Sequence, residues 1–218
     1  MRNNFIILTF ICSNLLAQAT FTATDIATSA DGAMGVFLAD LDNDGDLDIV
    51  SASANDNTIA WYENDGAANP SFTAANISTS HNDSPHSVFV ADMDNDGDLD
   101  IVAESYNDDK VAWYENDGAA NPSWTARNIG SNETDGAKNV FVSDINADGH
   151  MDIIAMSSLD SEVNFYKNDG AADPSWSVTD IASGSGLSMP NAGFAADLDN
   201  DGDLDVISAA KLITLNGY

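Results

Sequence analysis

The segment Asp40-Leu-Asp-Asn-Asp-Gly-Asp-Leu-Asp48 is the first of four closely similar segments in this chain. It returns at residues 92–100, in a modified form at residues 144–152, and at residues 197–205, so successive copies begin 52 or 53 residues apart. A fixed period of this length indicates stacked supersecondary units, none of which can bury its apolar faces alone. The sequence therefore predicts a repeat protein.

Strand-forming runs surround each acidic segment. In the second copy, short apolar runs at residues 86–91, 99–103, 110–114 and 124–129 predict four strands. The Asn-Asp-Gly sequence that ends at Gly118 is typical of a tight turn between strands. Four short antiparallel strands per repeat are typical of a propeller blade, and a β-solenoid or a sandwich array is the rival architecture.

We therefore expect an all-β fold, a β-propeller of about four four-stranded blades, which is either a closed four-bladed ring or a fragment of a larger ring. The repeats lie near residues 20–71, 72–123, 124–175 and 176–218. The recurring aromatic pairs are expected to pack between neighbouring blades, with only one residue of each pair buried, because alternate residues of a strand face opposite sides. These pairs are Trp61 and Tyr62, Trp113 and Tyr114, and Phe165 and Tyr166.

The two ends of the predicted propeller offer a way to close a ring. A fourth-strand pattern at residues 21–28 precedes any first strand. The last repeat has a first strand near 191–196, a second near 204–209 and a weak third at 212–215. Pairing the opening strand with this incomplete blade would remove an exposed sheet edge. The tail at 211–218 has lost the Trp-Tyr-Glu-Asn pattern, which fits a fragment of a larger ring as well.

Residues 1–19 have the pattern of a secretory signal peptide, with an early Arg2, an apolar run and small residues before Thr20. Cys12, the only cysteine, lies inside this segment, so the exported chain would contain no thiol. We expect a secreted or cell-surface protein, of bacterial type, with no membrane span after the signal is cleaved.

The chain of 218 residues has 36 acidic and 6 basic side chains, a formal net charge of −30. Such a surface disfavours nucleic acid and anionic membranes as partners. The 44% of hydrophobic residues nevertheless permits a packed core. The four acidic segments hold 18 of the 36 acidic residues, so half of the acidity lies at repeated positions and does not indicate a disordered tail.

The first acidic segment has the donors of a calcium loop. Asp40, Asp42, Asp44 and Asp48 stand at positions one, three, five and nine, and Gly45 at position six permits a sharp reversal. Position seven would contribute its backbone carbonyl. Oxygen donors without nitrogen or sulfur favour Ca²⁺ over zinc or copper. The alternative is an acidic surface turn, but four such turns in register would be self-repelling without a cation.

At this level of detail the segments 36–50 and 88–102 resemble FG-GAP/VCBS repeats, the calcium-binding units of integrin-α-like β-propellers in secreted proteins. The resemblance extends over the chain from residue 20 onward and implies one Ca²⁺ between the first and second strands of each blade, up to four ions. The metal ligands that it implies, with position seven acting through its carbonyl, are Asp40, Asp42, Asp44, Asp46 and Asp48; Asp92, Asp94, Asp96, Asp98 and Asp100; Asp144, Asn146, Asp148, His150 and Asp152; and Asp197, Asp199, Asp201, Asp203 and Asp205.

The third copy departs from this pattern. Asn146 is neutral where the other copies have Asp, and His150 stands at position seven. Fewer carboxylates attract a cation less strongly, so we expect the third site to be the weakest.

No catalytic motif is visible, and we expect that the protein is not an enzyme. The sequence contains no nucleophile elbow, phosphate-binding glycine loop or zinc motif, and its three histidines are His81, His86 and His150. The preferred function is a binding or adhesion module for a protein or glycan ligand at the cell surface. The alternatives are a structural repeat segment of a larger cell-surface protein and an accessory domain of a polysaccharide-active enzyme. The variable segments 81–86 and 131–138 are candidate ligand loops, as is 183–191.

Overall fold

The computed structural model describes residues 23–79, 83–131, 134–184 and 187–210. The predicted signal peptide and the weak strand at 212–215 lie outside these ranges. The strands are β1 (Ala33–Ala39), β2 (Asp48–Ser53), β3 (Thr58–Asn64), β4 (Phe72–Ser78), β5 (Pro85–Ala91), β6 (Asp100–Ser105), β7 (Lys110–Asn116), β8 (Trp124–Ser131), β9 (Ala137–Ser143), β10 (Asp152–Ser157), β11 (Glu162–Asn168), β12 (Trp176–Ser183), β13 (Pro190–Ala196) and β14 (Asp205–Ala210). No helix of the described residues is long and apolar enough to cross a membrane.

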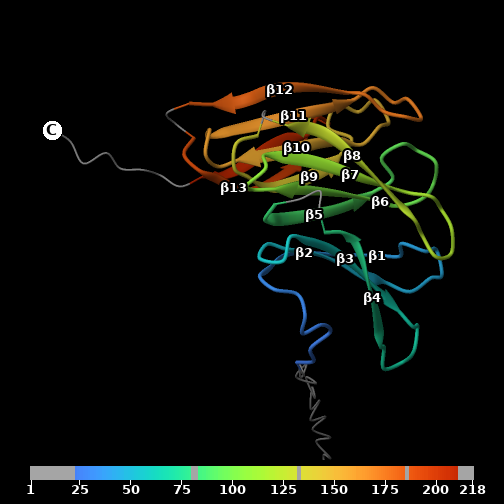
Figure 1. The fold of residues 1–218 in the computed structure, drawn as a ribbon. Coiled ribbons are helices and arrows are strands. Elements are labelled where there is room, and N and C mark those ends of the chain that lie inside the picture. Colours follow the sequence, from blue (N-terminus) through green and yellow to red (C-terminus); the bar gives the residue numbers. More distant parts are fainter. Residues whose placement is uncertain (1–22, 80–82, 132–133, 185–186, 211–218) are drawn as a thin grey trace, which may run out of the picture.

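These strands form antiparallel sheets in simple sequential order, which confirms the predicted all-β, propeller-like architecture (Figure 1). Blade 1 is β1–β4, blade 2 is β5–β8 and blade 3 is β9–β12, and the half-blade is the pair β13–β14. The first strands of successive blades lie next to one another, β1 against β5, β5 against β9 and β9 against β13. The first strand of each blade is therefore the inner strand of the stack.

Closure of the ring, one of the two alternatives that the sequence leaves open, is not seen in the part of the chain that the structure describes. Residues 23–32 form no strand, and β13 and β14 pair only with each other. Just before β1, the backbone N–H of Ala54 donates to the carbonyl of Gly32 (2.9 Å) and that of Asn55 to the carbonyl of Asp31 (3.1 Å), and equivalent bonds recur in blades 2 and 3. These bonds hold Asp31 and Gly32 against blade 1, at the opposite end of the stack from β13 (Figure 1).

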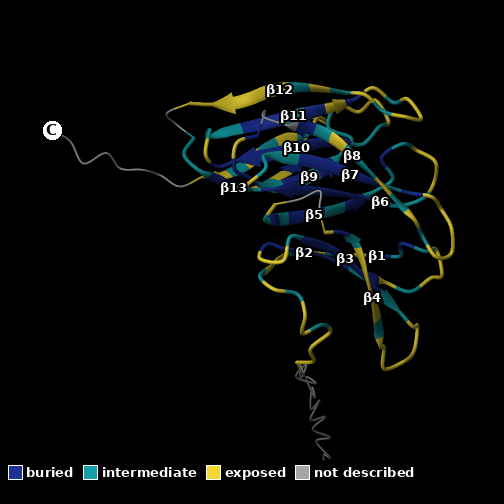
Figure 2. Ribbon diagram, in the orientation of Figure 1, coloured by how far each residue is buried: buried dark blue, intermediate teal, exposed yellow. Residues whose placement is uncertain are grey.

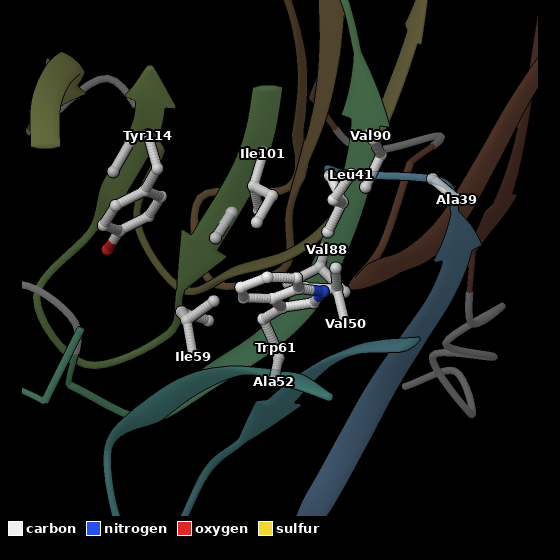
Figure 3. Packing of buried hydrophobic residues seen from close by; sticks show 12 residues of the cluster. Ala39, Leu41, Val50, Ala52, Ile59, Trp61, Val88, Val90, Ile101 and Tyr114 are labelled. Carbon is white, nitrogen blue, oxygen red and sulfur yellow. The ribbon is translucent and has the colours of Figure 1, made fainter. Parts of the chain in front are cut away.

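The core lies between the blades and not within one sheet (Figure 2). Trp61 of blade 1 and Tyr114 of blade 2 belong to one buried cluster, together with Val50, Ile59 and Val88. Figure 3 shows the indole of Trp61 lying among the three aliphatic side chains. The same arrangement recurs one interface later, because Trp113 and Tyr166 share the cluster between blades 2 and 3.

Members of all three aromatic pairs pack between blades as predicted. The expectation that only one member is buried holds for the third pair, in which Tyr166 is buried and Phe165 is half-buried, but it is wrong for the first two pairs. Trp113 is 1% exposed and Tyr114 is fully buried. Their side chains point to opposite faces of blade 2, and each face is covered by a neighbouring blade. Burial of both residues follows from the position of the blade in the stack.

Glu104 of β6 is a buried carboxyl group in this apolar layer. Its exposed fraction is zero, and neither carboxylate oxygen has a hydrogen-bond partner among the described residues. Burial raises the pKa of Glu104 well above its usual value of 4.5, although the nearby charge of Lys138 acts in the opposite direction. The same repeat position is occupied by Ala52 in blade 1 and by Met156 in blade 3.

We predict that Glu104→Met stabilises the protein at pH 8 by about 1–3 kcal/mol, the cost of an unsatisfied buried polar group. A carboxyl group whose folded pKa is raised stabilises the fold below its unfolded pKa, and this contribution is lost as the pH rises above about 4.5. Wild type should therefore lose stability relative to the variant as the pH increases. Urea unfolding of both proteins from pH 4 to pH 8 measures this, and a difference that is constant with pH would contradict it.

Candidate metal centre

The four acidic segments form loops between the first and second strands of each blade, and all four have the same backbone shape. The fourth residue is left-handed in every loop, with φ of 59° at Asn43, 61° at Asn95, 58° at Ala147 and 63° at Asn200. The glycine at position six also has a positive φ, between 91° and 99°. Asn adopts the left-handed region more readily than other non-glycine residues, so Ala147 is the unfavourable member of the set.

Backbone N–H groups of the loop orient the carboxylates of positions one, three and five. In the first loop, Asp40 accepts hydrogen bonds from the N–H groups of Asp44 (3.1 Å) and Gly45 (3.0 Å), and Asp44 accepts one from Asp46 (2.9 Å). One oxygen each of Asp40, Asp42 and Asp44 lies within 4.8 Å of the other two. The second loop repeats these bonds and this spacing with Asp92, Asp94 and Asp96.

The middle carboxylate of the cluster has a raised pKa in the first two loops. Partial burial raises the pKa of Asp42, and the neighbouring charge of Asp44 adds to the effect. Asp94 in the second loop behaves in the same way, with burial first and the charge of Asp96 second. Three converging carboxylates repel one another. Such a site fits a hard cation such as Ca²⁺, because the cation would neutralise the carboxylate charges and be coordinated by their oxygens.

The Asp residues at position nine have a role that sequence reasoning missed. Asp48 is fully buried, and its oxygens accept hydrogen bonds from the N–H groups of Leu41 (3.2 Å) and Asn64 (2.8 Å). The equivalent bonds form at Asp100 and at Asp152. Burial raises the pKa of Asp100 to about 7.

This side chain therefore anchors the acidic loop to the end of the third strand. In the first two loops it is not among the three clustered acids, whereas in the fourth loop Asp205 lies with Asp197 and Asp199. The Asn that recurs 16 residues after position nine was the signal in the sequence for this anchor.

Position seven links neighbouring loops through its side chain. Asn43 Nδ2 donates to Asp98 Oδ1 (3.1 Å) across the interface between blades 1 and 2. Asn95 Nδ2 lies 2.8 Å from His150 Nδ1 at the next interface. The turn glycines Gly66, Gly118 and Gly170 leave room for the side chain at position seven of their own blade, because a Cβ atom at any of them would collide with it.

A second link is made by the Asn at the end of the third strand. Asn116 Nδ2 donates to the carbonyls of Leu41 (2.9 Å) and Leu99 (3.1 Å), and Leu41 belongs to the loop of the preceding blade. Asn168 repeats this contact with Met93 and Met151. The acidic loops are therefore part of the interfaces between blades.

The third loop differs in ways that the sequence only partly indicated. Asn146 Nδ2 donates to Asp152 Oδ2 (2.7 Å), so the neutral side chain occupies an oxygen that a cation could use. Lys167 Nζ lies 3.1 Å from Asp148 Oδ2 and lowers the pKa of Asp148. Over the residues that the structure describes, this loop has no group of three clustered acids. These features support a weaker third site, which stays a prediction.

The candidate ligand loops are described only in part. Residues 80–82, 132–133 and 185–186 lie outside the described ranges, and His81 is among them. His86 stacks on the ring of Tyr106 (centroids 5.3 Å apart), and its Nε2 lies 3.3 Å from the hydroxyl of Ser84.

Three stretches of the chain match the family model described as FG-GAP-like repeat, at residues 40–103, 100–155 and 144–208. Among solved structures, the crystal structure of the V. cholerae biofilm matrix protein Bap1 is similar, with a TM-score of 0.46 and 17% sequence identity. The similarity covers 86% of this chain and 30% of that chain, so this chain spans about a third of the Bap1 length. No curated protein matches the chain.

We predict that Asn116→Ala destabilises the protein by about 1–3 kcal/mol, because it leaves the buried carbonyl of Leu41 without this donor. Asn64→Ala is the matched control, since Asn64 has the same repeat position but donates only within its own blade, to Leu47. Thermal or urea unfolding of both variants in the same buffer measures the difference. Equal losses at the two positions would contradict the proposed role of this contact between blades.

Proposed function

Because the chain belongs to the FG-GAP-like repeat family, we propose that it is an extracellular calcium-binding repeat module that presents a ligand-binding surface. The observation that carries the proposal is the convergence of three carboxylates in the first, second and fourth acidic loops. The export pattern of residues 1–19 and the acidic surface support an extracellular location.

The calcium ions would act as structural ions. The oxygens of Asp40, Asp42 and Asp44 would hold one ion, and the equivalent residues of the other loops would hold the rest. The first three loops are hydrogen-bonded to the third strand of their own blade through position nine, and Asn116 and Asn168 hold the first two loops from the next blade. A cation bound at such a loop would stabilise the contact between blades as well as the loop itself.

The inner strands supply a surface for a ligand. A groove of about 550 Å³ runs along β1, β5, β9 and β13 and combines polar with aromatic side chains. His86, Lys138 and Asn191 contribute hydrogen-bonding groups, and Phe89 and Phe141 contribute ring faces. Such a mixture suits a glycan or an extended peptide, which is the class of ligand that we propose. A purely structural segment of a larger surface protein is the second candidate, and the continuous stacking of the blades favours it.

Removal of calcium is expected to lower the melting temperature. A ligand at 100 times its Kd adds about 2.7 kcal/mol per site, which corresponds to several degrees for a domain of this size. Differential scanning calorimetry with Ca²⁺, with chelator, and with Mg²⁺ added in place of Ca²⁺ measures this. An unchanged melting temperature in chelator would refute the calcium proposal.

The third loop provides a gain-of-function test. Asn146→Asp restores the carboxylate that the other loops have and removes the hydrogen bond to Asp152, so the affinity of this loop for Ca²⁺ should rise by about tenfold, or ~1.4 kcal/mol. Asn76→Asp on the outer strand β4 adds the same charge away from the loops and should leave calcium binding unchanged. Calorimetric titration of both variants compares them, and equal responses would mean that Asn146 does not limit the third site.

A further inference from the structure

In the described part of the chain, the two ends of the blade stack expose apolar side chains. The leading face of blade 1 is defined here by Val36 (67% exposed), Leu38 (56%) and Leu47 (58%). The trailing face of the half-blade is defined by Phe194 (57% exposed), Leu198 (59%) and Ile207 (45%). Exposed apolar patches of this kind on otherwise charged proteins mark interaction surfaces.

The interface between blades 1 and 2 shows which kind of surface packs against a leading face and which packs against a trailing face. The repeat places Val88, Val90 and Leu99 of blade 2 at the positions of the leading face. It places Phe37, Leu41 and Val50 of blade 1 at the positions of the trailing face. These two sets pack against each other in one cluster, where Val88 is 5% exposed and Leu41 is fully buried.

The next interface repeats this pairing with other side chains. Val140, Val142 and Met151 of blade 3 occupy the leading positions and pack in the cluster that contains Met93 and Val102 of blade 2. A leading face therefore packs against a trailing face at both complete interfaces. By the same geometry, the exposed leading face of blade 1 is complementary to the exposed trailing face of the half-blade.

A ladder of phenylalanine rings runs along the inner strands in the same direction. Phe37 lies 4.6 Å from Phe89, Phe89 lies 5.4 Å from Phe141, and Phe141 lies 4.7 Å from Phe194, measured between ring centroids. The ladder stops at Phe194, which has no further ring beyond it among the described residues. A further blade 1 docked through its leading face on the half-blade would bring its own Phe37 next to Phe194 and continue the ladder.

Over residues 23–210, as far as the structure describes them, the two faces do not cover each other, because all six side chains that define them are exposed. We infer that the trailing face of one copy docks on the leading face of a second copy, in a head-to-tail contact that extends the stack of blades. Such a contact is heterologous, since two different surfaces meet, and it continues the packing already present between the blades of each chain. Self-association of this kind goes beyond calcium binding and ligand recognition.

The mass of the full chain, measured by analytical ultracentrifugation at increasing concentration in calcium buffer, tests this inference. We expect wild type to form dimers or larger species. Val36→Asp and Phe194→Asp should each weaken association at least tenfold, because every contact needs one intact face of each kind. Leu159→Asp is the control, since Leu159 is similarly exposed (54%) but lies in the turn between β10 and β11.

A mixture of the Val36→Asp and Phe194→Asp variants distinguishes head-to-tail docking from other contacts. The first variant keeps its trailing face and the second keeps its leading face, so the mixture should form a dimer with wild-type affinity and grow no further. Melting curves verify that both variants fold, and Leu38→Asp with Leu198→Asp forms a second pair if either does not. A wild-type chain that stays monomeric, or a mixture that does not associate, would overturn the inference.

Discussion

Burial of apolar side chains between adjacent blades is the interaction on which the other features of the chain depend. Each sheet carries apolar side chains on both faces, as with Trp113 and Tyr114, which point to opposite sides of blade 2. A single sheet would leave at least one of these faces in water, at a cost of roughly 25 cal/mol for each Å² of apolar surface. The blades are therefore stable when they are stacked on one another, and a stack of similar blades requires a repeated sequence.

The acidic loops belong to this stack and are not independent turns. Asp48 fixes its loop to the third strand of its own blade, and Asn116 holds the same loop from the next blade. The net charge of −30 is concentrated to a large extent at these positions. A cation in the loops would offset the repulsion among the carboxylates at the point where two blades meet, and it would thereby add to the cohesion of the blades.

Local sequence patterns predicted the positions of the strands. The runs expected at residues 86–91 and 110–114 correspond to β5 and β7 within two residues, because alternation and turn chemistry act over a few residues. The carboxylates of positions one, three and five also converge as their spacing indicated. The anchoring role of Asp48 was not predicted, since its partner Asn64 lies 16 residues away and is brought near only by pairing of β2 with β3.

The sequence by itself determined the repeat, the four-stranded blade and the oxygen-rich composition of the loops, because each depends on side chains that are close along the chain. Only the tertiary structure decided that the opening segment lies on blade 1, and which copy of a repeated residue is buried. Val36 and Val88 have the same place in their repeats, yet Val36 is 67% exposed and Val88 is 5% exposed. Burial depends on whether another blade covers the residue, and the repeat unit does not contain that information.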